Sequence, residues 1–247
     1  MSACGEPMSS IGTLWRVTIE EGPRAAFELV VRRILGPIIG NERLHYSLVA
    51  LADHWHDWRH GTNTGGVIPL ARLHIGEKTG REYVAVPERT WKLIFRHLPV
   101  NVDEFTYVDL GCGKGRTLLF AAERGFRRII GVDHSPELLE IAHANIMNAE
   151  LVCCDAARYE FPDEPLVGFL YNPFYADVMT AVAANLADSV KRHPREVYIA
   201  YFNPIDGIWD AAGFQAIRRC DALYPRYVIY TGETRRPTSS ASQATAS

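Results

Sequence analysis

The segment with the clearest chemical signal is a glycine-rich turn with the sequence YVDLGCGKGR. Gly111, Gly113 and Gly115 follow a short apolar run and precede a helical pattern. Glycines at this spacing let the backbone turn tightly and let a ligand approach it closely. The nicotinamide-binding fingerprint would place a further glycine where this chain has Arg116. The turn therefore indicates a nucleotide-like ligand, with a loop that binds nothing as the alternative.

Three carboxylates accompany the turn. Asp133 lies 22 residues after Gly111, at the end of the second predicted strand, where it can accept hydrogen bonds from both ribose hydroxyls of a nucleoside. Asp155 ends the third strand, where it can accept from the exocyclic amino group of adenine. Asp109 stands inside an apolar strand and needs a partner, for which a ligand ammonium is suitable. The alternatives are a helix-terminal charge at Asp133 and a turn aspartate at Asp155.

The fourth predicted strand ends in FLYNPFY, and this end faces the same crevice. The side-chain carbonyl of Asn172 can accept hydrogen bonds from an amino group, as can backbone carbonyls near Pro173. Phe174 and Tyr175 can form an aromatic wall around a flat or cationic substrate. We therefore take Asn172, Pro173 and Phe174 as catalytic candidates. The alternative is a strand terminator followed by core aromatic residues, and we favour that alternative for Tyr171.

The elements that must position these residues alternate between strand and helix. Apolar runs predict strands at 106–110, 128–132, 151–154, 167–171 and 197–202. Helices are predicted at 117–124, from 136 onward and at 175–190. Gly125 suits the end of the first helix, and Ser135 with Pro136 suits the start of the second. Tyr83 precedes a further helix, where it either closes over the ligand or packs against the edge of the sheet.

The chain ends differently from this alternation. Residues 214–219 and 226–231 are both strand-like, and the link between them is too short for a parallel crossover. The pattern predicts an α/β fold: a Rossmann-like, seven-stranded, mainly parallel sheet with an antiparallel terminal hairpin. We expect residues 1–75 to form an N-terminal helical extension or lid, with helices near 20–35 and 42–58. Residues 76–232 form the main domain, and residues 233–247 a disordered tail.

Composition narrows the class of protein. The net charge of −3 does not suit a chain-wide nucleic-acid surface. The five cysteines form no C-x-x-C pair, which disfavours a disulfide framework or a cysteine zinc site. The N-terminus lacks a signal-peptide pattern, and charges interrupt the most apolar stretch, residues 25–40. We expect a cytoplasmic protein without a membrane segment.

A histidine cluster before the main domain resembles a metal site at first sight. His54, His56 and His60 are accompanied by Asp53 and Asp57, but the first two histidines point apart on a helix. We therefore expect a solvated helix end rather than a metal site.

The motifs DLGCGKGR, GVDHSPELLEIAHANI, CDA and YNPF together resemble the class I S-adenosylmethionine (SAM)-dependent methyltransferases. The resemblance covers about residues 76–232, and a parallel sheet that ends in an antiparallel hairpin is the layout of these enzymes. It implies SAM as the cofactor. It also implies that Asp109, Gly111, Gly113 and Gly115 lie at the methionine end, Asp133 at the ribose and Asp155 at the adenine.

Two narrower resemblances concern the rest of the chain. Asp57, Arg59, Gly61, Thr64 and Gly66 match a D-x-R-x-G-x-x-T-x-G stretch shared by bacterial methyltransferases of unassigned substrate. The N-P-F-Y segment at 172–175 is similar to the N-P-P-Y motif of enzymes that methylate adenine or glutamine nitrogens, with phenylalanine in place of the second proline. It is also similar to the Asn-Phe site of the histone lysine methyltransferase that lacks a SET domain.

Both similarities favour methyl transfer to a nitrogen, with a protein side chain or a small molecule preferred over nucleic acid as the acceptor. Positioning can supply most of the catalysis of such a transfer, so no general acid or base is assigned. Three alternatives remain: a small-molecule O- or N-methyltransferase, a nicotinamide-dependent oxidoreductase and a non-catalytic SAM-binding module.

Overall fold

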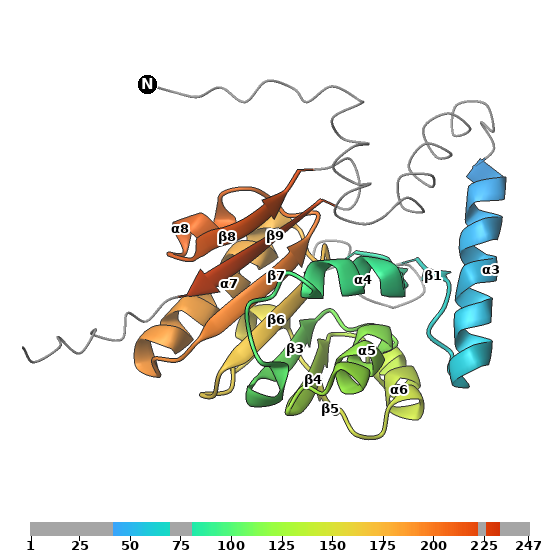
Figure 1. Cartoon of the computed structure of the whole chain (residues 1–247), viewed down its shortest axis with the longest axis horizontal. Helices are drawn as coiled ribbons and strands as arrows, with labels where there is room; N and C mark the ends of the chain where they lie inside the picture. Colours follow the sequence, from blue (N-terminus) through green and yellow to red (C-terminus); the bar gives the residue numbers. More distant parts are fainter. Residues whose placement is uncertain (1–41, 70–80, 222–225, 233–247) are drawn as a thin grey trace, which may run out of the picture.

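The computed structural model describes residues 42–69, 81–221 and 226–232 of the 247-residue chain (Figure 1). The predicted helix at 20–35, the expected domain boundary near residue 75 and the predicted disordered tail lie outside these ranges. In the part of the chain that is described, no helix combines the length and the apolar character needed to cross a membrane.

A seven-stranded sheet forms the centre of the molecule, in the order β5-β4-β3-β6-β7-β9-β8. Its strands are β3 (Thr106–Leu110), β4 (Arg128–Asp133), β5 (Glu150–Cys153), β6 (Leu166–Tyr171), β7 (Val197–Phe202), β8 (Gln215–Cys220) and β9 (Tyr227–Gly232). The first five are mutually parallel, whereas β9 pairs antiparallel with both β7 and β8. The predicted mainly parallel sheet with an antiparallel terminal hairpin is confirmed.

Helices cover both faces of this sheet (Figure 1). One face packs against α4 (Glu88–Phe95), α5 (Arg116–Arg124) and α6 (Pro136–Asn145). The other packs against α7 (Ala176–Arg192) and the short α8 (Ile208–Ala211). The central strands are therefore apolar on both faces, as expected for a parallel sheet, whereas the edge strands β5 and β8 are more exposed. Strand β3 shows this, since Tyr107 packs in the first layer, and Val108 and Leu110 in the second.

Local sequence explains where these helices begin and end. Helix α6 begins as predicted, because the Ser135 side chain accepts a hydrogen bond from the Leu138 amide and Pro136 occupies the first turn. Helix α5 ends at Gly125, whose φ of 88° suits glycine. The cap at Ser135 places the start of α6 directly after Asp133, at the carboxyl end of β4, where predicted site residues lie.

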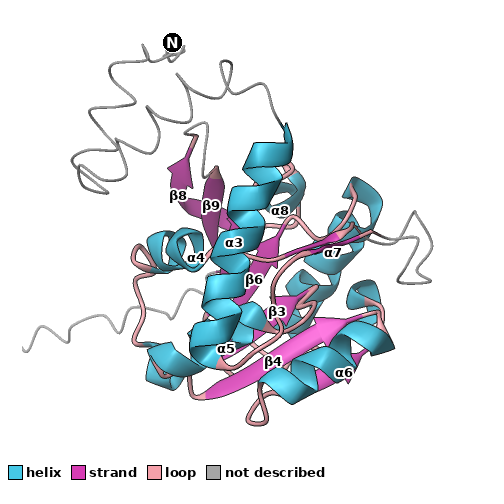
Figure 2. Ribbon diagram, turned by 90° about the vertical axis from the view of Figure 1, so that its right-hand side faces the viewer, coloured by secondary structure: helices cyan, strands magenta, loops and turns pink. Residues whose placement is uncertain are grey.

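The N-terminal part begins with helix α3 (Glu42–His60), which confirms the helix predicted at 42–58. The lower end of α3 lies beside α5 (Figure 2), where the His56 ring meets the edge of Phe120 at 5.6 Å between centroids. A loop then leads to β1 (Val67–Ile68), which pairs antiparallel with β2 (Tyr83–Val84). The extension and the main domain thus share a small sheet.

Candidate functional site

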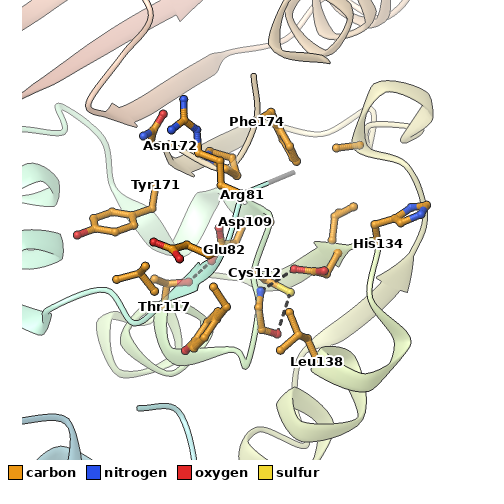
Figure 3. Close-up of a pocket in the computed structure, with 18 of the residues that line it drawn as sticks. Arg81, Glu82, Asp109, Cys112, Thr117, His134, Leu138, Tyr171, Asn172 and Phe174 are labelled. Atoms are coloured by element: carbon orange, nitrogen blue, oxygen red, sulfur yellow. Dashed lines mark hydrogen bonds between the residues drawn. The ribbon is translucent and has the colours of Figure 1, made fainter. Parts of the chain in front are cut away.

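A cavity of about 500 Å³ opens at the carboxyl ends of β3, β4 and β6 (Figure 3). This is the place where open α/β sheets bind their ligands, and the volume is ordinary for a small-molecule site. Among the predicted site residues, those that line the cavity are Asp109, Gly111, Gly113, Asp133, Asp155, Asn172, Pro173 and Phe174. Gly115 is absent from this lining, and a Cβ there would meet Ala142 of α6 at 3.1 Å. Its place in the motif is thus explained by helix packing.

The glycine turn is in close contact with Pro173 and with the Tyr83 ring. Gly111 and Gly113 have φ angles of 85° and 54°, which side chains rarely adopt. A Cβ at Gly111 would lie 2.6 Å from Pro173, and one at Gly113 would lie 2.3 Å from the Tyr83 ring. The glycines therefore let the turn approach two other segments, one after β6 and one from β2.

Asp133 holds this turn in place. Its Oδ2 accepts a hydrogen bond from the Gly113 amide at 2.8 Å, and its Oδ1 accepts from the Ser135 amide at 2.9 Å. Burial raises the pKa of the Asp133 carboxyl, although these amide hydrogen bonds act in the opposite direction. Each carboxylate oxygen retains a lone pair, so the group can still accept hydrogen bonds from a ligand in the cavity.

Asp109 lies deeper in the same cavity. It accepts a hydrogen bond from the Thr117 hydroxyl. Burial raises the pKa of the Asp109 carboxyl to about 7, and the nearby Asp133 charge acts in the same direction. In the described part of the chain no cationic side chain forms an ion pair with it, so a cationic group of a ligand would complete the site.

Asp155 follows β5 and caps a short 3-10 helix, Ala156–Arg158. Its side chain accepts a hydrogen bond from the Ala157 amide at 2.9 Å. The geometry of a turn aspartate is therefore present, and the same residue also lines the cavity.

Asn172 adopts an unusual backbone conformation for a residue other than glycine, with a φ of 51°. Such strain persists only where the surroundings enforce it, and it is frequent at functional sites. The turn is supported by Tyr171, whose ring stacks on Phe202 with a centroid distance of 4.3 Å. Beyond it, the Pro173 carbonyl accepts a hydrogen bond from the Arg81 amide at 3.1 Å, and Phe174 is buried against the core.

The loop after α3 is held by Asp57. Its carboxylate accepts hydrogen bonds from the Thr64 amide and hydroxyl, at 2.8 and 2.7 Å, and from the Gly65 amide at 2.7 Å. The Thr62 hydroxyl donates to it as well. Burial opposes ionisation, but these hydrogen bonds lower the pKa of Asp57 overall.

This loop docks on the glycine turn. The Lys114 ammonium donates to the Gly65 carbonyl at 2.7 Å, and the Arg116 side chain donates to the Thr64 hydroxyl at 2.7 Å. The Tyr83 hydroxyl donates to the Thr64 carbonyl, which holds the Tyr83 ring against Gly113. The first alternative considered for Tyr83, closure over the cavity, fits this position.

The expectation of a solvated helix end at the histidine cluster is wrong in part. His54 is exposed, but Asp53 and His56 are buried because this face of α3 packs on α5. Burial lowers the pKa of His56, and the Arg116 charge adds to the effect. Within the described ranges, no group of three His, Cys, Asp or Glu side chains is arranged to hold a metal ion.

Sequence reasoning missed several residues of the cavity wall: Arg81, Glu82, Thr117 and His134. Thr117 carried a signal, because it is the second residue of the helix that follows the glycines. Arg81 and Glu82 carried none, since their position depends on the pairing of β1 with β2.

Comparisons with known proteins agree with this geometry. A family model described as a methyltransferase domain matches residues 108–193, from β3 through α7. No curated protein matches the chain.

Solved structures that resemble the chain include a predicted N6-adenine-specific DNA methylase from Listeria monocytogenes, with 16% identity and a TM-score of 0.48. The match covers 60% of this chain and 51% of that protein, so this chain spans about half of its length. A TehB-like SAM-dependent methyltransferase from Corynebacterium glutamicum has 14% identity and a TM-score of 0.43, over 74% of this chain and 97% of that one. A SAM-dependent methyltransferase from Aquifex aeolicus has 13% identity and a TM-score of 0.45, over 59% and 93%.

The site suits the cofactor of such enzymes. The glycine turn, which the Asp133 carboxylate borders, suits a nucleoside. Asp109 is buried and has no cationic partner among the described side chains, so it suits a ligand that also carries an ammonium group. The matched segment forms most of this cavity, and the sheet has the expected terminal hairpin. Residues 108–193 therefore form a methyltransferase domain, and the cavity suits S-adenosylmethionine as its cofactor.

Proposed function

We propose that this enzyme methylates a nitrogen atom of a protein side chain or of a small molecule. The observation that carries the proposal is Asn172, which ends β6 at the cavity with a φ of 51°. Asn203, which follows β7, has a similar φ of 48° but does not line the cavity, so the support for a role in ligand contact comes from the position of Asn172 in the cavity wall. Its side-chain carbonyl can accept an N–H of the acceptor, and this would orient the nitrogen lone pair.

The other cavity residues would bind the cofactor. We assign Asp133 to the ribose hydroxyls, Asp155 to the adenine amino group, and Asp109 with the turn of Gly111 and Gly113 to the methionine end. Gly115 would act indirectly, by letting α6 approach the turn.

When bound, SAM would supply a methyl group: the bond from the methyl carbon to the positively charged sulfur breaks as the acceptor nitrogen bonds to that carbon. The methylated nitrogen then releases a proton to water. The protein then has to position the acceptor, and Pro173, Phe174 and Tyr175 would form the wall that does so.

We further propose that the N-terminal extension acts as a cover of this site. The hydrogen bonds of Thr64 and Gly65 with Arg116 and Lys114, and the Tyr83 ring against Gly113, support that role. The net charge of −3 supports a protein or small-molecule acceptor over nucleic acid.

The test is transfer of radiolabelled methyl from SAM into a fractionated cell extract, with the Asp133→Ala protein as control. Label in protein or small molecules above the control supports the proposal, and label in nucleic acid contradicts the acceptor class. Label that withstands hydroxylamine and mild base indicates nitrogen rather than a carboxyl ester.

O-Methylation of a small molecule is the second candidate. A labelled product whose methyl group is on oxygen, identified by mass spectrometry, would replace the nitrogen proposal. Tighter binding of NADH than of SAM would instead revive the oxidoreductase alternative.

A further inference from the structure

Arg81 places a positive charge at the rim of the cavity. The Arg81 guanidinium carbon lies 4.7 Å from the centre of the Tyr175 ring, in a cation–π contact. The Arg81 amide donates to the Pro173 carbonyl at 3.1 Å, which fixes this residue beside the Asn172 turn. Figure 3 shows Arg81 and Asn172 on the same side of the cavity, and both residues line it.

The surroundings leave this guanidinium available to a ligand. Among the residues that the structure describes, Arg81 contacts the Tyr175 ring but forms no ion pair. The neighbouring Glu82 carboxylate is directed away from it, toward the Tyr171 side of the cavity (Figure 3). The other cavity arginine, Arg116, is buried and paired with Asp53.

The cation–π contact with Tyr175 restrains the guanidinium of Arg81, and the N–H groups in the guanidinium plane remain able to donate hydrogen bonds. Such a pre-organised fork matches a carboxylate or phosphate, which can accept two parallel hydrogen bonds. Apart from Arg81 and the paired Arg116, the charged side chains of the cavity wall are the carboxylates of Glu82, Asp109, Asp133 and Asp155. An anion would be repelled by these groups and attracted to Arg81.

We propose that the methyl acceptor carries an anionic group, a carboxylate or a phosphate, which Arg81 binds while Tyr175 holds the guanidinium. The inference rests on the proposed function, because it names the class of substrate for that site. The acceptor is then an amine with an acidic group within one side-chain length of the reacting nitrogen.

Calorimetry on the protein loaded with S-adenosylhomocysteine tests the anion site without turnover. Benzoate and inorganic phosphate serve as probes, and the probe that binds more tightly shows whether the site prefers a carboxylate or a phosphate. We expect Arg81→Gln to weaken binding of the stronger probe at least tenfold. Arg81→Lys should retain only part of the wild-type affinity for this probe, since lysine cannot donate two parallel hydrogen bonds as arginine does.

Arg59→Gln is the matched control, because Arg59 also lies over an aromatic ring, Trp55 at 5.3 Å, but does not line the cavity. This variant should bind both probes as the wild type does. Equal probe binding by the wild type and Arg81→Gln overturns the proposal, as does absence of probe binding to the wild type. A tenfold loss of S-adenosylhomocysteine affinity in Arg81→Gln also overturns it, since Arg81 would then hold the cofactor carboxylate.

Labelling of extract separates this proposal from the proposed function. Wild-type protein should place radiolabel in acceptors that an anion exchanger retains, and Arg81→Gln should lose most of it. If the wild type and Arg81→Gln incorporate equal amounts of radiolabel, the proposal of an anion site at Arg81 is overturned. If the wild type labels nothing, the proposed function fails, and the calorimetry still decides whether Arg81 binds an anion.

Discussion

The Arg116 guanidinium forms a buried ion pair with the Asp53 carboxylate, 63 residues earlier in the chain. Arg116 is the first residue of α5, directly after the glycine turn, and Asp53 lies on α3. The Asp53 carboxylate also accepts a hydrogen bond from the Gly66 amide at 3.0 Å. The pair thus joins the N-terminal extension to the segment that forms the cofactor cavity.

Removal of Asp53 should therefore destabilise the whole domain. Asp53→Ala leaves the Arg116 charge buried, with a hydrogen bond to the Thr64 hydroxyl and a carboxylate, Asp57, only at 3.8 Å. We expect a loss of about 3 kcal/mol in the free energy of unfolding. Urea denaturation measures this loss. Asp188→Ala, which removes an exposed pair with Lys191, is the control and should cost under about 0.5 kcal/mol. Equal effects of the two variants would show that the buried pair stabilises nothing.

The same arginine shows where sequence reasoning ends. From the sequence, Arg116 only marked the absence of a nicotinamide fingerprint, because its partners lie in segments that are distant along the chain. The strand positions, the antiparallel terminal hairpin and the carboxylates that line the cavity could be predicted, since strand patterns and glycine spacing are local signals. The burial of Asp53 and His56 could not, because it depends on which face of α3 meets α5.

Asp133→Ala should weaken SAM binding at least tenfold. The variant removes the carboxylate that we propose for the ribose hydroxyls, and it also removes the hydrogen bond that holds the Gly113 amide. Isothermal titration calorimetry gives the affinity, and the melting temperature of the free protein shows whether the fold is intact. Asp163→Ala, an exposed position, is a control that should bind SAM normally. Unchanged affinity of Asp133→Ala would remove this residue from the cofactor site.

Two substitutions at Asn172 separate its side chain from its backbone. Asn172→Gly keeps the positive φ without strain and removes the amide, whereas Asn172→Ala removes the amide and adds strain. We expect both to bind SAM as the wild type does and to lose at least tenfold in kcat/KM. Normal turnover by Asn172→Gly would show that only the backbone conformation matters, and that the amide does not contact the acceptor.

Asp109 should make cofactor binding depend on pH. Its pKa of about 7 in the free protein means that half of the carboxyl groups are protonated near neutrality, and an ammonium prefers the ionised form. SAM affinity should therefore rise between pH 6 and pH 8, and this rise should vanish in Asp109→Asn. A parallel pH dependence in both proteins would assign the effect to another group.

The raised pKa also predicts the sign of a stability change in the free protein. The folded state retains the Asp109 proton up to about pH 7, whereas the unfolded chain releases it near 3.8. Within that window the folded state binds more protons, so the free energy of unfolding falls as the pH rises toward 7. Relative to Asp109→Asn, the wild type should thus lose stability between pH 5 and pH 7 in urea denaturation, and a gain would contradict the protonated state.

The contact of Tyr83 with Gly113 can be measured as a coupling between the glycine turn and β2, the strand that pairs with β1 of the extension. Gly113→Ala places a Cβ 2.3 Å from the Tyr83 ring at a φ of 54°, so both steric overlap and backbone strain should reduce SAM affinity. In the Tyr83→Ala background only the strain remains, and the same substitution should cost less. We expect a coupling of about 1–2 kcal/mol in SAM binding from the double-mutant cycle. Additive losses would mean that the Tyr83 ring moves away when SAM binds, and that the extension does not cover the occupied site.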